Sequence, residues 1–76
     1  MNESTKLELL RLKNDVLVVM QVLEEDIKAN IEGIADSKSV TERFSYFGFA
    51  NELKNNHDTL VRFSVNIDEM IEIKGW

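Results

Sequence analysis

The most unusual group of side chains in the sequence is an aromatic cluster, Phe44, Tyr46, Phe47 and Phe49, which surrounds Gly48. On a helix, Phe44 and Phe47 share one face, whereas Tyr46 and Phe49 share another. Aromatic side chains often anchor protein interfaces, and a glycine among them permits close approach of another backbone. The cluster therefore predicts a partner-binding patch. The alternative interpretation is that the same rings close one end of a helical core.

His57 is the only histidine, and we expect neither catalysis nor metal binding from it. Helical bundles that bind metals place a glutamate three residues before the histidine, but Lys54 occupies that position here. The sequence also lacks a glycine-rich phosphate loop, a serine nucleophile elbow and a paired acid–base motif. The expectation is therefore no enzyme, no metal and no cofactor, with His57 at the surface or at the edge of the core.

Acidic residues give the chain a formal net charge of −5 and are spread along its length. The densest run, residues 24–26, is typical of a solvated helix face, and the alternative is a docking surface for a basic partner. Nucleic-acid binding requires a concentrated positive patch, whereas the basic residues are scattered apart from Lys6, Arg11 and Lys13 near one helix end. The charge pattern therefore argues against nucleic acid as a partner.

The sequence predicts neither a membrane span nor a signal peptide. Its longest apolar run, residues 16–20, is much shorter than the roughly 20 residues that a spanning helix needs. The absence of cysteine excludes disulfides and thiolate zinc sites and favours a cytoplasmic location.

Apolar residues recur at spacings of three and four through the first half of the chain, which predicts a long helix. Thr5 and Glu8 form a capping box at its start, with Ser4 as an alternative cap, and Gly33 ends it. The main apolar stripe consists of Leu9, Leu12, Val16, Val19, Leu23, Ile27, Ile31 and Ile34. A second set lies outside this stripe and consists of Leu7, Leu10, Leu17, Val18, Met20 and Val22. Two such sets require more than one neighbouring helix.

A second helix is expected to begin at the capping box of Ser39 and Glu42 and to end at Gly75, with Trp76 left without an assigned role. Its line of residues seven apart consists of Leu53, Leu60 and Ile67. Residues 55–58 are poor helix formers and predict a kink or break, while residues 61–68 alternate as a strand would. A helix is favoured because no glycine or proline interrupts residues 50–74 and a lone strand would have no sheet to join.

The sequence thus predicts an all-α single domain, residues 1–76, folded as an antiparallel two-helix hairpin that self-associates into a helical bundle. Each Leu or Val left exposed forfeits about 1.5–3 kcal/mol, so we expect self-association through Leu10, Leu17, Val18 and Val22. The expected function is a small non-enzymatic protein–protein interaction module, such as an adaptor, regulator or inhibitor, acting as a homodimer or with a helical protein partner. The alternatives are a nucleic-acid-binding helical-hairpin dimer and a secretion or assembly chaperone.

Overall fold

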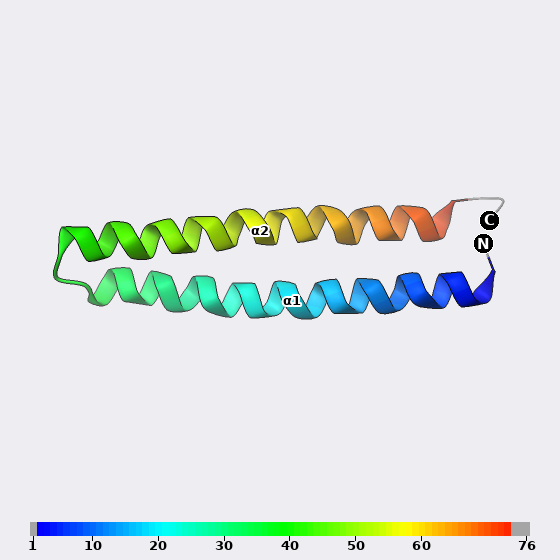
Figure 1. Ribbon diagram of the computed structural model, residues 1–76, viewed down its shortest axis with the longest axis horizontal. Coiled ribbons are helices and arrows are strands. Elements are labelled where there is room, and N and C mark those ends of the chain that lie inside the picture. Colours follow the sequence, from blue (N-terminus) through cyan, green and yellow to red (C-terminus); the bar gives the residue numbers. More distant parts are fainter. Residues whose placement is uncertain (1, 74–76) are drawn as a thin grey trace.

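The computed structural model describes residues 2–73, which form two long helices joined by a short loop (Figure 1). Helix α1 spans Glu3–Asp36 and helix α2 spans Val40–Glu72. The helices lie side by side and antiparallel along their whole length. The molecule is elongated, with extents of 58 × 15 × 11 Å along its principal axes. The described residues contain no strand. The predicted all-α antiparallel hairpin is therefore confirmed.

Helix α1 begins earlier than the sequence pattern suggested. Asn2 is its N-cap, and the Asn2 side-chain oxygen accepts a hydrogen bond from the Thr5 backbone N–H at 2.8 Å. The predicted caps at Thr5 and Ser4 are therefore wrong, because asparagine is a strong N-cap residue and the N–H that it satisfies belongs to Thr5 itself.

Helix α2 begins at the predicted cap. The Ser39 hydroxyl accepts from the Glu42 backbone N–H at 3.5 Å. The Glu42 carboxylate accepts from the Ser37 hydroxyl at 3.0 Å, so it stabilises the loop instead of returning to the Ser39 backbone N–H as in a capping box. Helix α2 ends at Glu72, and the C-cap Ile73 is extended, with its backbone N–H donating to the Met70 carbonyl at 3.4 Å. The predicted end at Gly75 is therefore wrong, because the helix stops before that glycine is reached; Trp76 lies outside the described residues.

Gly33 lies inside α1, and the prediction that it ends this helix is wrong. The helix continues to Asp36, and the Ser37 backbone N–H donates to the Ile34 carbonyl at 3.3 Å. A Cβ atom added at Gly33 would lie 2.8–2.9 Å from three ring atoms of Tyr46, whereas carbon atoms in ordinary contact are about 3.5–4.0 Å apart. Glycine is needed here for the close packing of a ring from α2, not for a turn.

The interface between the helices, which we call the seam, is a line of residues spaced alternately by three and four. In α1 it consists of Leu9, Lys13, Val16, Met20, Leu23, Ile27, Asn30 and Ile34; in α2 it consists of Tyr46, Ala50, Leu53, His57, Leu60, Ser64, Ile67 and Ile71. This alternation is the heptad pattern of a coiled coil. The predicted line of Leu53, Leu60 and Ile67 is confirmed.

The seam of α1 differs from the predicted stripe at three places. Lys13, Met20 and Asn30 occupy positions that the prediction gave to the neighbouring residues Leu12, Val19 and Ile31, which are about half exposed. The apolar surface of α1 is broad enough to form either the predicted stripe or the observed seam. Contact with α2 imposes a repeat of 3.5 residues per turn, and this repeat fits the observed seam.

Helix α2 is continuous through residues 55–58, so neither the predicted break nor the alternative strand is present. Lys54 Nζ donates to Asp58 Oδ2 at 2.8 Å, and Thr59 Oγ1 donates to the Asn55 carbonyl at 3.1 Å. An ion pair at this spacing supports a helix, and the long seam on either side offsets the weak intrinsic propensity of the stretch. Within the described residues, neither helix is long and apolar enough to cross a membrane.

Candidate protein interaction surfaces

The hairpin buries little of its apolar surface. Only Val16, Ala50 and Ile67 of the described residues are more than nine-tenths buried, at 8, 7 and 6% exposure. The large apolar side chains that remain more than a third exposed are Leu7, Leu10, Leu12, Leu17, Val18, Val19, Val22, Ile31, Val40, Phe44, Tyr46, Phe47, Phe49, Val61, Phe63, Val65, Met70 and Ile73. Exposed apolar surface on this scale is typical of protein interaction sites, so it is the candidate functional site.

Contacts across the seam define the alignment of the two helices. These contacts join Lys13 Nζ to Asp68 Oδ1 at 2.6 Å, Glu24 Oε1 to His57 Nε2 at 2.8 Å, and the position of Gly33 to the ring of Tyr46. The two residue numbers of each pair add up to nearly the same total, as an antiparallel arrangement requires. One register therefore holds along the hairpin and shows which residues of α1 and α2 lie at the same level.

The exposed apolar side chains form two rows, one on each side of the seam, because helix positions next to the seam point sideways. The row that we call the Leu17 face consists of Leu7, Leu10, Leu17, Ile31, Val40, Phe44, Phe47, Val61 and Val65. The row that we call the Val19 face consists of Leu12, Val19, Val22, Phe49, Phe63, Met70 and Ile73. The exposed apolar surface of the hairpin is thus divided into two separate faces.

The residues predicted for self-association do not share one surface. Leu10 and Leu17 lie on the Leu17 face and Val22 lies on the Val19 face, whereas Val18 is opposite the seam, on the outer side of α1. All four are exposed. The sequence pattern grouped them because they fall outside one stripe, but only the position of α2 shows on which side of the seam each residue lies.

The aromatic cluster is divided among three places. Tyr46 packs in the seam against Gly33, and Phe49 lies on the Val19 face. Phe44 and Phe47 share the Leu17 face, near the loop, and neither packs in the core. The chain therefore uses one ring of the cluster to close the loop end of the seam and leaves the others on its surface.

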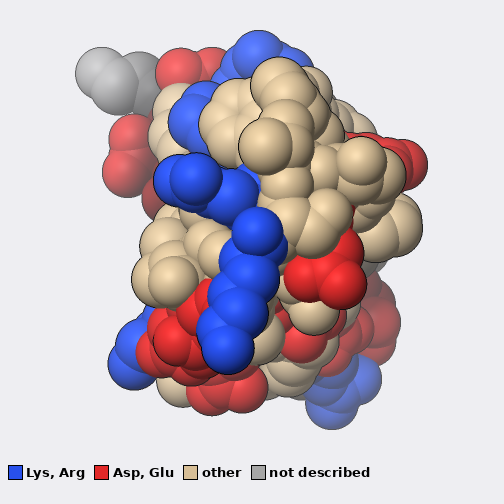
Figure 2. All heavy atoms as spheres, turned by 90° about the vertical axis from the view of Figure 1, so that its left-hand side faces the viewer, with Lys and Arg blue, Asp and Glu red and all other residues tan. Residues whose placement is uncertain are grey.

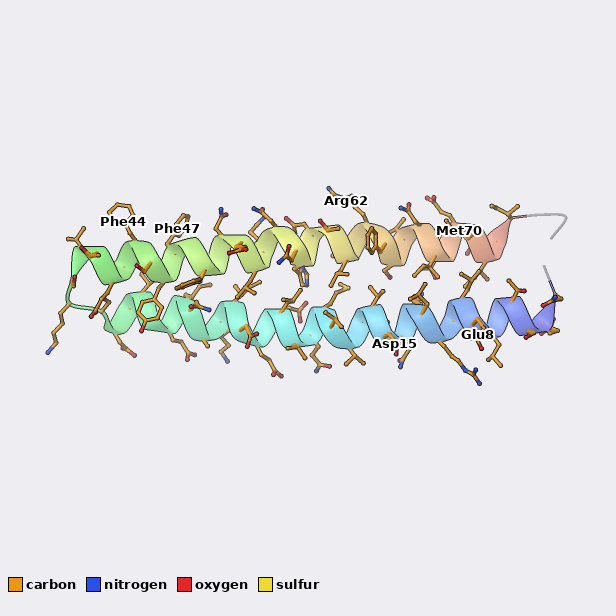
Figure 3. The ribbon with its side chains drawn as sticks, in the orientation of Figure 1. Glu8, Asp15, Phe44, Phe47, Arg62 and Met70 are labelled. Atoms are coloured by element: carbon orange, nitrogen blue, oxygen red, sulfur yellow. The ribbon has the colours of Figure 1, made fainter. Side chains whose placement is uncertain are left out.

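Phe44 and Phe47 line a shallow open hollow of about 280 Å³ together with Val40 and Arg43. Phe44 is 73% exposed and Phe47 is 60% exposed. Figure 2 looks onto this loop end and shows uncharged surface over much of its upper half, beside Lys and Arg side chains; Figure 3 shows both rings on neighbouring turns of α2. Two exposed rings beside a hollow resemble the centre of an interface, where aromatic residues contribute most of the binding energy.

The two faces differ in charge. Halfway along the hairpin the Leu17 face carries both signs, from Glu24, Lys28, Lys54 and Asp58. The hydrogen bond from Lys54, together with its positive charge, holds the pKa of Asp58 below its ordinary value. The charged positions along the Val19 face, by contrast, are acidic throughout and consist of Glu8, Asp15, Asp26, Asp36, Glu42 and Glu52. Figure 3 shows Glu8 and Asp15 on the side of α1 away from α2.

The basic residues near the start of α1 are partly neutralised. Arg11 Nη1 lies 2.7 Å from Glu8 Oε1, and Lys13 Nζ lies 2.6 Å from Asp68 Oδ1. These ion pairs reduce the positive charge that a nucleic-acid phosphate would meet at this end of the helix.

His57 lies in the seam with its side chain 19% exposed, and its Nε2 lies 2.8 Å from Glu24 Oε1. The ring thus links α2 to α1, which agrees with the expected place at the edge of the core. No group of three or more potential metal-ligating side chains is present in residues 2–73.

Comparison of the chain with models of known protein families, with curated protein sequences and with solved structures finds no match.

Proposed function

We propose that the chain is a small non-enzymatic protein–protein interaction module, an adaptor, regulator or inhibitor that acts as a dimer or with a helical partner. The observation that carries this proposal is the pair of apolar faces on either side of a thinly covered seam. Burial of apolar area contributes about 25 cal/mol per Å², so a second layer of helices on either face would stabilise the hairpin substantially. Four-helix bundles cover such faces in this way.

The proposal predicts that folding and association are linked. Thermal unfolding followed by circular dichroism should shift to higher temperature as the protein concentration rises, because association stabilises only the folded chain. Sedimentation over the same concentration range should show a rise in mass. A chain that unfolds cooperatively at one temperature whatever its concentration, and that sediments as a monomer throughout, would contradict the proposal.

Three successive residues provide matched variants. Leu17→Gln combined with Val19→Gln places an amide on each face and should abolish the concentration dependence. Val18→Gln makes a similar change between them, on the outer side of α1, and should retain it. If the two proteins behave alike, the apolar faces are not the surfaces through which the chain associates.

A further inference from the structure

We infer that the Val19 face binds a basic amphipathic helix of a different protein, and that the lysine and arginine side chains of this helix lie mainly near the loop of the hairpin. This inference rests on the proposed function and names the face, the chemistry of the partner and its placement. It follows from the distribution of apolar and acidic residues along the Val19 face and from the ion pairs that the chain makes elsewhere.

The apolar row of the Val19 face contains side chains from both helices. Away from the loop, Leu12 and Val19 of α1 lie at the levels of Met70 and Phe63 of α2, and all four are about half exposed. Phe49, at 58% exposure, is the residue of the row that lies nearest the loop. A third helix suits such a row, since its apolar residues at spacings of three and four contact both helices at once. From Leu12 to the level of Phe49, the row matches a partner helix of roughly 20 residues.

Acidic residues flank the row, and most of them lie in the half of the hairpin near the loop. The loop half carries Asp26, Asp36, Glu42 and Glu52, and the other half carries Glu8 and Asp15; all six are exposed. No lysine or arginine of residues 2–73 lies on this face. A partner without positive charge would desolvate these carboxylates and give nothing in return, which is costly.

The register of the seam places like charges at the same level near the loop. Asp26 of α1 lies level with Glu52 of α2, and Asp36 lies level with Glu42, on the same side of the seam. Carboxylates at one level repel each other in the isolated chain, and a basic side chain placed between them would relieve this repulsion. The positive charge of the partner is therefore expected beside Phe49 rather than beside Leu12.

The carboxylates of the Val19 face are largely available to a partner. Within the described chain, Glu8 is the only one of the six that forms an ion pair, with Arg11 at 2.7 Å. Beside the Leu17 face, by contrast, Lys54 lies 2.8 Å from Asp58, so that face carries both signs and satisfies this pair internally. A basic partner can thus bind the Val19 face and leave the ion pairs between α1 and α2 intact.

A second copy of this chain does not supply the positive charge that the Val19 face needs. The Leu17 face and the outer sides of the helices each carry more acidic than basic residues. Lys13 is paired with Asp68 in the seam, while Lys38 and Arg43 lie at the loop, at one end of the hairpin and not along a face. The occupant is therefore a different chain, in which basic residues flank an apolar stripe.

A synthetic peptide tests the chemistry of the face. The probe is a helix of about 20 residues with leucine at spacings of three and four and with lysine beside the leucines of one half; the control peptide has glutamate in place of each lysine. Fluorescence anisotropy of labelled peptide with the full chain should show binding of the lysine peptide that weakens as the salt concentration rises. The glutamate peptide should bind at least about tenfold more weakly. Absence of binding by the lysine peptide, or equal binding by both, would overturn the inference.

Two matched double variants separate a specific contact from general attraction to an acidic chain. Asp26→Asn with Glu52→Gln removes two carboxylates beside Phe49, whereas Glu25→Gln with Glu32→Gln removes two exposed carboxylates from the outer side of α1. The first variant should bind the lysine peptide about tenfold more weakly, and the second should change the affinity by less than about twofold. Equal losses would overturn the inference. Circular dichroism of both variants checks that the helices are retained.

Single substitutions identify the face. Val19→Gln should weaken binding of the lysine peptide, whereas Leu17→Gln, on the other side of the seam, should retain it; the reverse result would place the peptide on the wrong face. Sedimentation of the same two variants without peptide tests for a second copy, because a loss of self-association with Val19→Gln but not with Leu17→Gln would show that this chain itself covers the Val19 face. Either result would overturn this inference and leave the proposed function intact, since the chain would still bind a partner. A chain that neither self-associates nor binds the lysine peptide would contradict both.

Discussion

Alanine at the two helical glycines should affect stability in opposite directions. An added Cβ at Gly48 has nothing within 4 Å, whereas at Gly33 it would lie 2.8–2.9 Å from the ring of Tyr46. Alanine is about 0.8–1.0 kcal/mol more favourable than glycine inside a helix, so Gly48→Ala should raise the free energy of unfolding by about that amount. Gly33→Ala has the same intrinsic gain but forces overlap with the ring, and overpacking costs about 1–3 kcal/mol.

The expected result is that Gly33→Ala is less stable than Gly48→Ala by about 1–3 kcal/mol. Urea unfolding followed by circular dichroism measures both values, provided that all proteins are compared at one concentration. In a chain that already carries Tyr46→Ala, the ring is absent and Gly33→Ala should become stabilising by about 1 kcal/mol. Equal stabilisation by the two alanines in the unaltered background would refute the reasoning, because the ring would then have moved aside without cost.

Two further predictions concern burial and charge. Ile67→Ala, at one of the most buried positions, should lower the free energy of unfolding by about 2–4 kcal/mol, whereas Val18→Ala on the outer side of α1 should change it by less than about 0.5 kcal/mol; similar values in urea unfolding would contradict the observed seam. Because the pKa of Asp58 is lowered in the folded chain, the stability that its pair with Lys54 contributes is present at neutral pH and is lost as the pH falls through that pKa. Titration of the Asp58 carboxyl by NMR should give a pKa below 3.8, and Lys54→Met should raise it; an unchanged pKa in the variant would show that the lysine is not its cause.

The sequence was sufficient to predict the overall fold because the features that determine it are local. The cap at Ser39, the spacing of Leu53, Leu60 and Ile67, and a connection too short for anything but antiparallel neighbours all follow from residue types and spacing. Apart from the cap of α1, where Asn2 and Thr5 are three residues apart, the main features predicted wrongly depend on contacts between distant residues. Gly33 fits the pattern of a helix end within α1, but the ring that requires a glycine there, that of Tyr46, comes from the other helix.

The candidate interaction site could be predicted only in part for the same reason. A single helix with apolar residues on several sides does not show which of them its neighbour will cover. The sequence identified Leu10, Leu17, Val18 and Val22 as surplus to one stripe, and all four are exposed. Which of these residues lie on which face depends on how α1 is aligned with α2. The spacing of residues within α1 does not determine that alignment.

The composition of the seam supplies a further argument for a partner. Lys13, Asn30, His57 and Ser64 occupy seam positions, where a polar side chain fixes the register of a coiled coil but reduces its stability. Leu12, Val19 and Ile31 lie beside the seam and are about half exposed. A hairpin whose stability depended only on contact between its own two helices would gain from the reverse arrangement, with the larger apolar side chains in the seam.

The observed arrangement has a physical advantage only when the lateral faces are covered. The polar seam residues then keep the two helices aligned, through the pairs Lys13 with Asp68 and His57 with Glu24, while the stabilising apolar burial takes place between hairpins. Under the proposed function, alignment within the chain and burial against a partner would be carried by different residues of the same helices. The polar seam residues are therefore compatible with a stable assembly, in which most of the apolar burial would take place outside the seam.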